Sequence, residues 1–183
     1  MDRRQTKSKN AIISAFVCLL SQKHFDHITV GDIISLADVS RATFYAHFET
    51  KQDLLKILCE ELFCHISDSL RLDSPNHNHI FSCNAPDSVF LHLFQHIKKN
   101  DNHILDLLKS SNNELFLQYF EVELVKLIST QLPHFESRKH EILPEEYWIE
   151  HISAIFTHTV RWWCKNGLTE TPERITEYFY YAV

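Results

Sequence analysis

The chain has 183 residues, of which 44% are hydrophobic and 23% are charged, a balance typical of a globular protein that buries a core. It contains only two glycines, Gly31 and Gly167. Tight sheet turns and the phosphate-binding loops of Rossmann and P-loop proteins need glycines, so the composition excludes those nucleotide-binding motifs and indicates an all-α fold. The net charge is −6, but residues 1–56 carry +2 and residues 57–183 carry −8. Only the amino-terminal part is therefore suited to a polyanionic partner.

The amino terminus resembles a signal peptide in outline, because basic residues precede the apolar run Ala11–Leu20. Ser14 interrupts that run, however, and no small-residue cleavage site follows before Lys23. The apolar residues recur at helical spacing, so we interpret this segment as the first helix. The five cysteines are scattered and form no C-x-x-C pair. We therefore expect a cytoplasmic protein, and no stretch approaches the ~18 apolar residues of a membrane span.

Four helices are predicted before the first long loop. The apolar pattern indicates a helix over about Thr6–Gln22 and another over about Lys51–Leu72. Between these two, Thr29 can cap a short helix, and Ser40 can cap a second short helix over Arg41–Phe48. Three residues separate the two short helices.

The polar stretch Asp73–Pro86 is predicted to be a loop that joins two regions. Five helices are expected after it, over about 87–99, 102–109, 113–131 and 145–166, and from Pro172 onward. We thus predict an all-α protein of about nine helices in two domains. Residues 1–50 form a three-helix domain, residues 51–183 form a larger helical domain, and the helix over 51–72 connects them.

Residues 29–51 have the pattern of a helix-turn-helix. Two short helices bury little surface alone, so they need an apolar side that packs on neighbours, here Val30, Ile33, Ile34, Val39, Phe44 and Phe48. The other side of the second short helix presents small or phosphate-seeking groups, namely Arg41, Thr43, Tyr45, Ala46 and His47. Such a face is compatible with a DNA major groove about 12 Å wide. Hydroxyls and N–H groups near the helix starts, at Thr29, Ser40 and Lys51, favour phosphate.

The segment T-V-G-D-I-I-S-L-A-D-V-S-R-A-T-F-Y-A-H-F-E-T-K-Q-D-L-L, with the helix before it, resembles the TetR family signature. The resemblance implies a nucleoid-associated bacterial repressor that binds a palindromic double-stranded DNA operator as a homodimer and is released by an unidentified small-molecule effector. It implies phosphate contacts from Thr29, Ser40, Thr43, Tyr45 and Lys51. It implies contacts to base edges from Arg41, Ala42, Tyr45 and His47.

Asp38 departs from the family pattern, which usually has glycine in the turn. Glycine suits a left-handed backbone, and aspartate is among the residues that tolerate that conformation best. The fold should therefore survive, while the carboxylate places a negative charge near the DNA. This leaves the alternative of a ligand-binding co-activator that kept the fold and lost direct DNA binding.

The carboxyl-terminal domain carries two predicted sites, one for dimerisation and one for the effector. A stripe at helical spacing is expected to join two subunits, or else to pack on its own core: Trp148, Ile152, Ile155, Phe156, Thr159, Trp163, Tyr178 and Phe179. A pocket for a neutral or hydrophobic effector is expected among Phe90, Phe94, Leu108, Phe116, Tyr119, Phe120 and Trp162. The ending W-W-C-K-N-G-L-T-E-T-P-E also resembles dihydroxyacetone kinase regulator-like members of the family, without identifying a ligand.

Thirteen histidines suggest a metal site as a competing interpretation. His92 and His96 stand four apart on one predicted helix with His103 nearby, and His77 and His79 lie in the predicted loop. A pair can chelate zinc, but zinc sites need three or four ligands, so we predict no metal and no cofactor and keep a metal-responsive regulator as an alternative. No serine or cysteine lies in a nucleophile motif, and the adjacent acidic residues do not face each other on a helix, so we predict no enzymatic activity.

Overall fold

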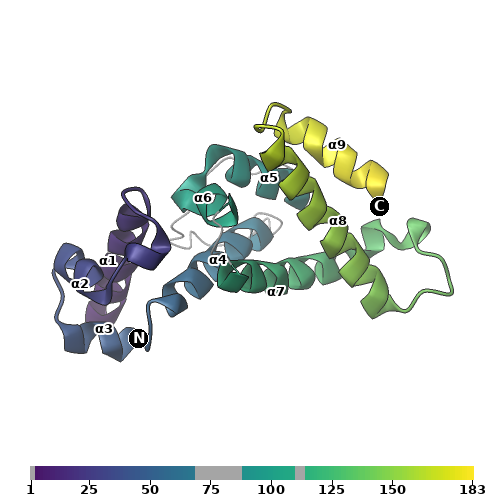
Figure 1. Ribbon diagram of the computed structural model, residues 1–183. Helices are drawn as coiled ribbons and strands as arrows, with labels where there is room; N and C mark the ends of the chain where they lie inside the picture. The colour runs from purple at the N-terminus through teal and green to yellow at the C-terminus, as the bar shows by residue number, and fades with distance from the viewer. Residues whose placement is uncertain (1–2, 69–87, 110–113) are drawn as a thin grey trace.

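The computed structural model describes residues 3–68, 88–109 and 114–183, and over these ranges it consists of nine α-helices and four short 3-10 turns with no strand (Figure 1). The predicted all-α fold is confirmed. The predicted loop Asp73–Pro86 lies outside the described residues. So do residues 69–72, the end of the predicted connecting helix. No helix among the described residues is long and apolar enough to cross a membrane.

The amino-terminal unit is a three-helix bundle. Its elements are α1 (Arg3–Leu20), η1 (Phe25–His27), α2 (Val30–Ala37) and α3 (Arg41–His47). Helical spacing places Ile12, Phe16, Ile33 and Phe44 on facing sides, and all four side chains are fully buried. This small core is what fixes the orientation of α3, a helix of only seven residues.

The two short helices begin and end where the local chemistry predicts. The Thr29 hydroxyl accepts from the Asp32 N–H at 3.1 Å, and the Asp32 carboxylate accepts from the Thr29 N–H at 2.8 Å, which completes a capping box. At the other end of α2, Asp38 adopts a left-handed conformation with φ 51° and ψ 48°, and its N–H donates to the carbonyl of Ile34. The prediction that Asp38 replaces a turn glycine with left-handed backbone is confirmed.

A single helix, α4 (Gln52–Asp68), leads from the bundle into the larger domain (Figure 1). One of its faces is apolar at every turn, with Leu54, Leu58, Leu62 and Ile66 all buried. The helix packs along α7 (Glu114–Gln131). The position of the amino-terminal bundle is therefore tied to the packing of the larger domain.

The larger domain is built around α5 (Val89–Lys99), which contacts α4, α6 (Ile104–Lys109) and α9 (Pro172–Ala182). Its other elements are α7, η2 (Asp101–His103), η3 (Leu132–His134), η4 (Glu136–Arg138) and α8 (Glu145–Lys165). The long helix α8 contacts both α7 and α9 (Figure 1). Gly167 lies just beyond its end, after Asn166, with a φ of 71° that suits glycine as predicted, and Pro172 opens α9.

Aromatic rings form the centre of this domain. Phe94 stacks on Phe156 with ring centroids 4.6 Å apart, and Phe90 lies 4.8 Å from Phe179. Trp163 meets the edge of Phe94 and donates its indole N–H to the carbonyl of Glu170 at 3.1 Å. Because these side chains are fully buried within one subunit, they are part of the subunit's own core.

This core changes the interpretation of both predicted carboxyl-terminal sites. Of the stripe predicted to join two subunits, the residues buried within the subunit are Trp148, Ile152, Phe156, Thr159, Trp163 and Phe179. They follow the alternative left open by the sequence, packing on their own core, and only Ile155 and Tyr178 keep appreciable exposed surface. Phe90, Phe94 and Phe116, predicted to line the effector pocket, are likewise packed in the core.

Candidate nucleic-acid interface and effector cavity

One face of α3 is free for contact with another molecule. Phe44 and Phe48 turn inward, 0% and 3% exposed, whereas Arg41, Ala42 and Tyr45 are exposed. Tyr45 is half exposed, with its ring held edge-to-face against Phe44 at a centroid distance of 5.4 Å. The face carries one cation, one small side chain and one aromatic hydroxyl. Those groups suit the base edges and phosphates of a major groove.

The start of α3 offers a hydroxyl pair. The Ser40 hydroxyl accepts from the Thr43 N–H at 3.0 Å and lies 2.8 Å from the Thr43 hydroxyl. Two hydroxyls that share one hydrogen bond keep one O–H for an outside acceptor. Both side chains line a shallow hollow between α1 and α3, together with Gln5, Ser8, Asp38, Val39, Ala42, Ala46 and His47. A phosphate at this hollow would meet both the spare hydroxyl donor and the α3 start.

Lys51 has a different role from the predicted phosphate contact. Its ammonium donates to the carbonyls of Phe25 and Ile28, each at 2.9 Å, and to that of Asp26 at 3.2 Å. It also lies 4.4 Å from the centre of the Phe25 ring. An ammonium has three hydrogens, so all of its donors are used inside the protein. Lys51 binds η1 to the start of α4.

Two further predicted contacts are also engaged within the bundle. The His47 ring, half-buried, makes a hydrogen bond at 2.7 Å between Nε2 and the Ser8 hydroxyl of α1. The Thr29 hydroxyl donates to the Asp32 carboxylate at 2.8 Å. Lys23 reaches the same carboxylate at 2.7 Å, and its hydrogen bond and the Thr29 N–H hold the pKa of Asp32 well below its usual range. These groups stabilise the bundle, so fewer side chains are available to contact DNA than the sequence predicts.

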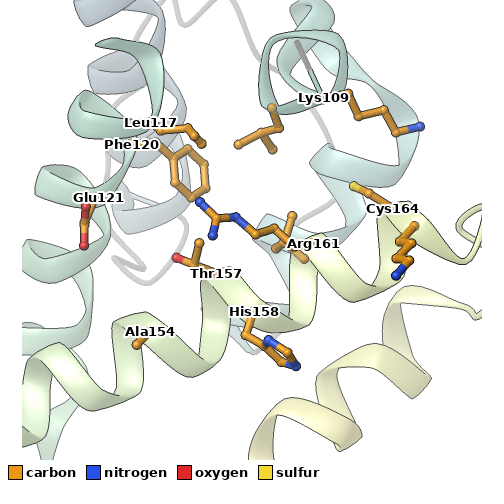
Figure 2. Close-up of a pocket in the computed structure, with 12 residues that line it drawn as sticks. Lys109, Leu117, Phe120, Glu121, Ala154, Thr157, His158, Arg161 and Cys164 are labelled. Atoms are coloured by element: carbon orange, nitrogen blue, oxygen red, sulfur yellow. The ribbon is translucent and has the colours of Figure 1, made fainter. Parts of the chain in front are cut away.

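A cavity of about 770 Å³ lies between α6, α7 and α8, as Figure 2 shows. Two of the predicted pocket residues, Leu108 and Phe120, line it. The others do not: Tyr119 packs against the core, and Trp162 is 42% exposed on another face of α8. The remaining lining residues are Lys109, Leu117, Glu121, Ala154, Thr157, His158, Val160, Arg161, Cys164 and Lys165.

The lining of this cavity is basic as well as apolar. Arg161 extends toward the Phe120 side of the cavity in Figure 2. Lys109 and Lys165 also line the cavity. Glu121 is the only carboxylate among the lining residues. These three cations are exposed, so their charges are solvated without a ligand. The neutral or hydrophobic effector expected from the sequence stays a prediction, and the basic lining also suits an apolar molecule with an acidic group.

Sequence and structure comparisons agree with this arrangement. Residues 12–58, from α1 into α4, match the family model described as "Bacterial regulatory proteins, tetR family". Residues 84–183 match the TetR model described as "Transcriptional regulator C-terminal region", which covers more than half of the chain. The chain belongs to the TetR family.

Individual TetR-type relatives span most of the chain. A crystal structure of a TetR transcriptional regulator from Streptococcus agalactiae 2603V is 32% identical, with a TM-score of 0.73 over 97% of this chain and 94% of that chain. The Bacillus subtilis HTH-type regulator YxbF is 23% identical over 98% of this chain and 45% of its own length. The Staphylococcus epidermidis IcaR, a negative regulator of the biofilm operon icaADBC, is 27% identical over 54% of this chain and 50% of its own length. The chain thus spans half or less of these curated relatives.

Asp38 distinguishes this TetR-family chain from the usual turn glycine, and its exposed carboxylate borders the hollow beside α3. We predict that Asp38→Asn raises DNA affinity about fivefold, because it removes a negative charge beside the hollow, within a Debye length of ~10 Å of DNA bound at α3. Asp38→Gly should match that gain and also raise the melting temperature, since glycine adopts positive φ without strain. Fluorescence anisotropy with labelled DNA and thermal unfolding measure the two effects. Equal affinity of all three proteins would show that the carboxylate lies away from the DNA.

Proposed function

We propose that the chain is a repressor that binds a palindromic operator as a homodimer, with α3 of each subunit in a major groove. The observation that carries this proposal is the outward face of α3, where Arg41, Ala42 and Tyr45 stand on a helix fixed by the Ser40 cap and the Phe44 core. The mildly positive charge of residues 1–56 is consistent with a polyanionic partner. Similarity to IcaR, whose name describes negative regulation, favours repression.

A mobility-shift assay with the DNA upstream of the chain's own gene tests this function. We expect a specific complex whose affinity falls steeply and log-linearly with salt, because phosphate contacts release counterions. Arg41→Ala should weaken the complex and reduce the salt slope. If a selection from genomic fragments yields no bound DNA, the co-activator without direct DNA binding is the better description.

The dimer is expected to form through the outer face of α8 and α9. Trp162 is 42% exposed, and its ring lies 6.0 Å from that of Tyr178, which is 36% exposed. Tyr147 at the start of α8 and Tyr181 near the end of α9 are 55% and 88% exposed. Large aromatic side chains on one pair of helices are typical of a surface that a partner covers. A second copy of the chain would meet this face with the same residues.

We predict that Trp162→Glu converts the dimer to a monomer, because it places a charge at the centre of the aromatic face. Analytical ultracentrifugation measures the change, with an expected loss of at least about 100-fold in dimer affinity. Val122→Glu on α7, where valine is 54% exposed, is the matched control and should leave the dimer intact. A dimer that survives Trp162→Glu would place the interface elsewhere.

The cavity between α6, α7 and α8 is the proposed effector site. Lys109 borders this cavity and also a small hollow between the amino-terminal bundle and α6, lined on the bundle side by residues 20–25. The turn η2, directly before α6, contacts α1. A ligand that moves α6 would thereby shift the bundle. Repression would end when the bound state favours a recognition-helix spacing that no longer fits the operator.

We predict that Arg161→Gln weakens binding of the aromatic sulfonate 8-anilinonaphthalene-1-sulfonate about tenfold. This probe combines an apolar body with an anionic group, and the substitution removes the cation that enters the cavity. Fluorescence titration gives the affinity. Arg174→Gln on α9, where the arginine pairs with Glu177 at 2.7 Å outside the cavity, is the control. Equal loss in both variants would contradict a site at Arg161.

A further inference from the structure

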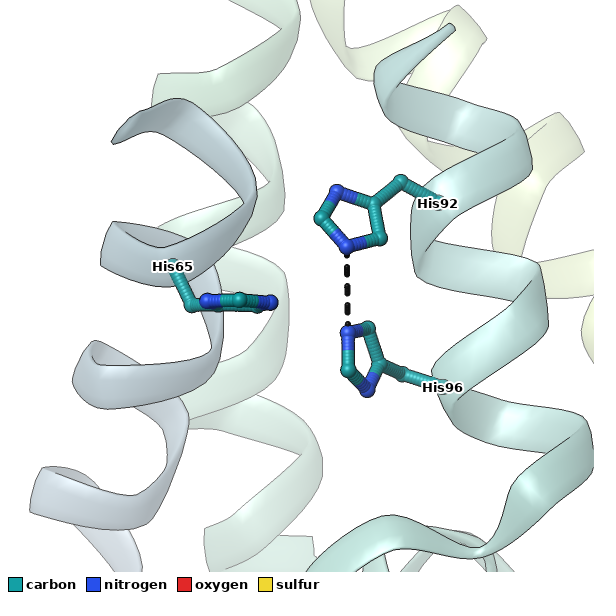
Figure 3. Close-up of side chains that lie close together, drawn as sticks. All are labelled: His65, His92 and His96. Atoms are coloured by element: carbon teal, nitrogen blue, oxygen red, sulfur yellow. Dashed lines mark hydrogen bonds between the residues drawn. The ribbon is translucent and has the colours of Figure 1, made fainter. Parts of the chain in front are cut away.

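Three histidines meet between α4 and α5. His92 and His96 lie one turn apart on α5, and the fold brings His65 of α4 to the same place, as Figure 3 shows. One ring nitrogen from each lies within 4.8 Å of the others. The centroid of the His65 ring is 5.0 Å from each of the other two rings. The predicted histidine pair thus gains a third member, which is the minimum for a protein zinc site.

The other predicted candidates do not join this cluster. His103 bonds instead to the Asp106 carboxylate at 3.0 Å. His77 and His79 lie outside the described residues. The cluster is therefore defined by His65, His92 and His96 alone among the residues the structure describes.

An acidic side chain orients one of these rings. The Nδ1 of His96 lies 2.7 Å from the Asp101 carboxylate, which also pairs with Lys99 at 3.4 Å. A carboxylate accepts, so Nδ1 carries the hydrogen and Nε2 of His96 keeps its lone pair. That lone pair faces Nε2 of His92 at 3.1 Å. A carboxylate behind a ligating histidine is a recurrent feature of metal sites, because it fixes the tautomer.

The spacing of the nitrogens suits a tetrahedral ion. Two nitrogens bound at 2.0–2.1 Å to a tetrahedral metal are separated by about 3.3 Å. The Nε2 atoms of His92 and His96 are 3.1 Å apart, so a small movement of either ring would make room for an ion between them. A hydrogen bond from His92 to His96 also accounts for that single distance. It does not account for the third imidazole directed at the same point from another helix (Figure 3).

Burial favours the neutral rings of His92 and His96, which is the form that binds metal. His92 is 0% exposed and His96 is 2% exposed. Burial and the neighbouring imidazoles lower the pKa of His92 to about 3, so this ring is neutral at pH 7. Packing polar rings in an apolar interior has an energetic cost that a bound ion would offset.

We propose that His65, His92 and His96 bind one divalent ion of the zinc class, with Asp101 as the positioning residue behind His96. Three imidazole nitrogens suit Zn²⁺ and similar borderline ions rather than Ca²⁺ or Mg²⁺, which prefer oxygen ligands. Three protein ligands leave a fourth position for water or another small ligand. The ion would join α4, which leads from the recognition helix, to α5 in the larger domain. This inference concerns ion binding and stands whether or not the chain binds DNA.

Titration of tag-free, chelator-treated full chain with Zn²⁺ in a competition assay tests the site. We expect one tight site per chain, a rise in melting temperature on Zn²⁺ addition, and with Co²⁺ the visible absorption typical of tetrahedral coordination. His92→Gln should weaken Zn²⁺ binding at least about 100-fold, and Asp101→Asn, which keeps all three ligands, should weaken it about 10- to 100-fold. The exposed His134 provides the control His134→Gln, which should bind as the wild type does.

A second substitution distinguishes loss of the metal site from misfolding caused by a change at a buried position. His65 is only half-buried, so His65→Gln should keep its helical circular dichroism and still lose the tetrahedral Co²⁺ absorption. The proposal is overturned if the wild type shows no saturable site. It is equally overturned if His65→Gln and His92→Gln proteins that remain folded bind Zn²⁺ with unchanged affinity.

Discussion

Replacing Tyr45 by alanine is expected to lower operator affinity about 100-fold while leaving the fold and the dimer intact. Tyr45 is half exposed on α3 and touches its own subunit mainly through the edge of Phe44, so little core packing is lost. Loss of a good contact in a groove costs about 1–3 kcal/mol. A symmetric dimer loses it twice, about 3 kcal/mol in all, which corresponds to roughly 100-fold. Fluorescence anisotropy at fixed salt measures the change.

The control is Val122→Ala, which shortens a side chain of 54% exposure on α7, away from α3 and from the proposed dimer face. It should leave operator affinity unchanged. Melting temperature and sedimentation of both variants should match those of the wild type. Unchanged affinity of Tyr45→Ala would mean that α3 presents a different face to the DNA.

Replacing Lys51 by methionine is expected to destabilise the amino-terminal bundle by about 3 kcal/mol. The substitution leaves three carbonyls without their donor and removes the ammonium from the face of Phe25. Hydrogen bonds to charged groups are worth about 1.5–3 kcal/mol each, and water recovers part of that at this half-buried site. For a chain of this size the loss corresponds to a fall in melting temperature of roughly 6–12 °C. Differential scanning calorimetry measures it.

Lys56→Met tests whether another lysine nearby, on α4, has the same effect as Lys51. Lys56 is exposed and lies 3.8 Å from Glu60, a surface pair of small energetic value. Its replacement should leave the melting temperature almost unchanged. If Lys51→Met kept the wild-type melting temperature and lost only salt-sensitive DNA affinity, Lys51 would contact phosphate, as the sequence suggested.

Local chemistry made much of this fold predictable. Thr29 and Ser40 have hydroxyls that cap helices, and both start the helices expected of them. Gly167 and Pro172 likewise mark the end of α8 and the start of α9. Each of these signals depends on residues close together in the chain, so the sequence alone is enough to predict where these helices begin and end.

Which side chains form a site is less predictable from the sequence, because it depends on which elements pack against each other. Trp162 and Trp163 are adjacent, yet Trp163 is fully buried and Trp162 is 42% exposed. Helical periodicity gives the apolar stripe of α8 but does not say whether its neighbour is the same subunit or a second one. The sequence therefore could not separate core from interface.

Long-range pairing explains the remaining differences. His65 precedes His92 by 27 positions, and nothing local indicates that α4 and α5 bring them together. Arg161 lies on a polar face of α8, and only the positions of α6 and α7 show that this face lines a cavity. In the sequence Lys51 resembles an ordinary exposed cation, and only the structure shows that a carbonyl of η1 accepts its hydrogen bond. In each case the deciding contact lies on another element.

Hydroxyl-radical footprinting on a DNA fragment selected from genomic DNA is the most direct test that α3 reads an operator. The proposed geometry predicts two protected regions related by two-fold symmetry on one face of the duplex, in successive major grooves. The protection should disappear in Tyr45→Ala at concentrations where the wild type saturates the site. Failure to select any fragment, or an unchanged footprint with Tyr45→Ala, would contradict the assignment of α3 as the recognition helix.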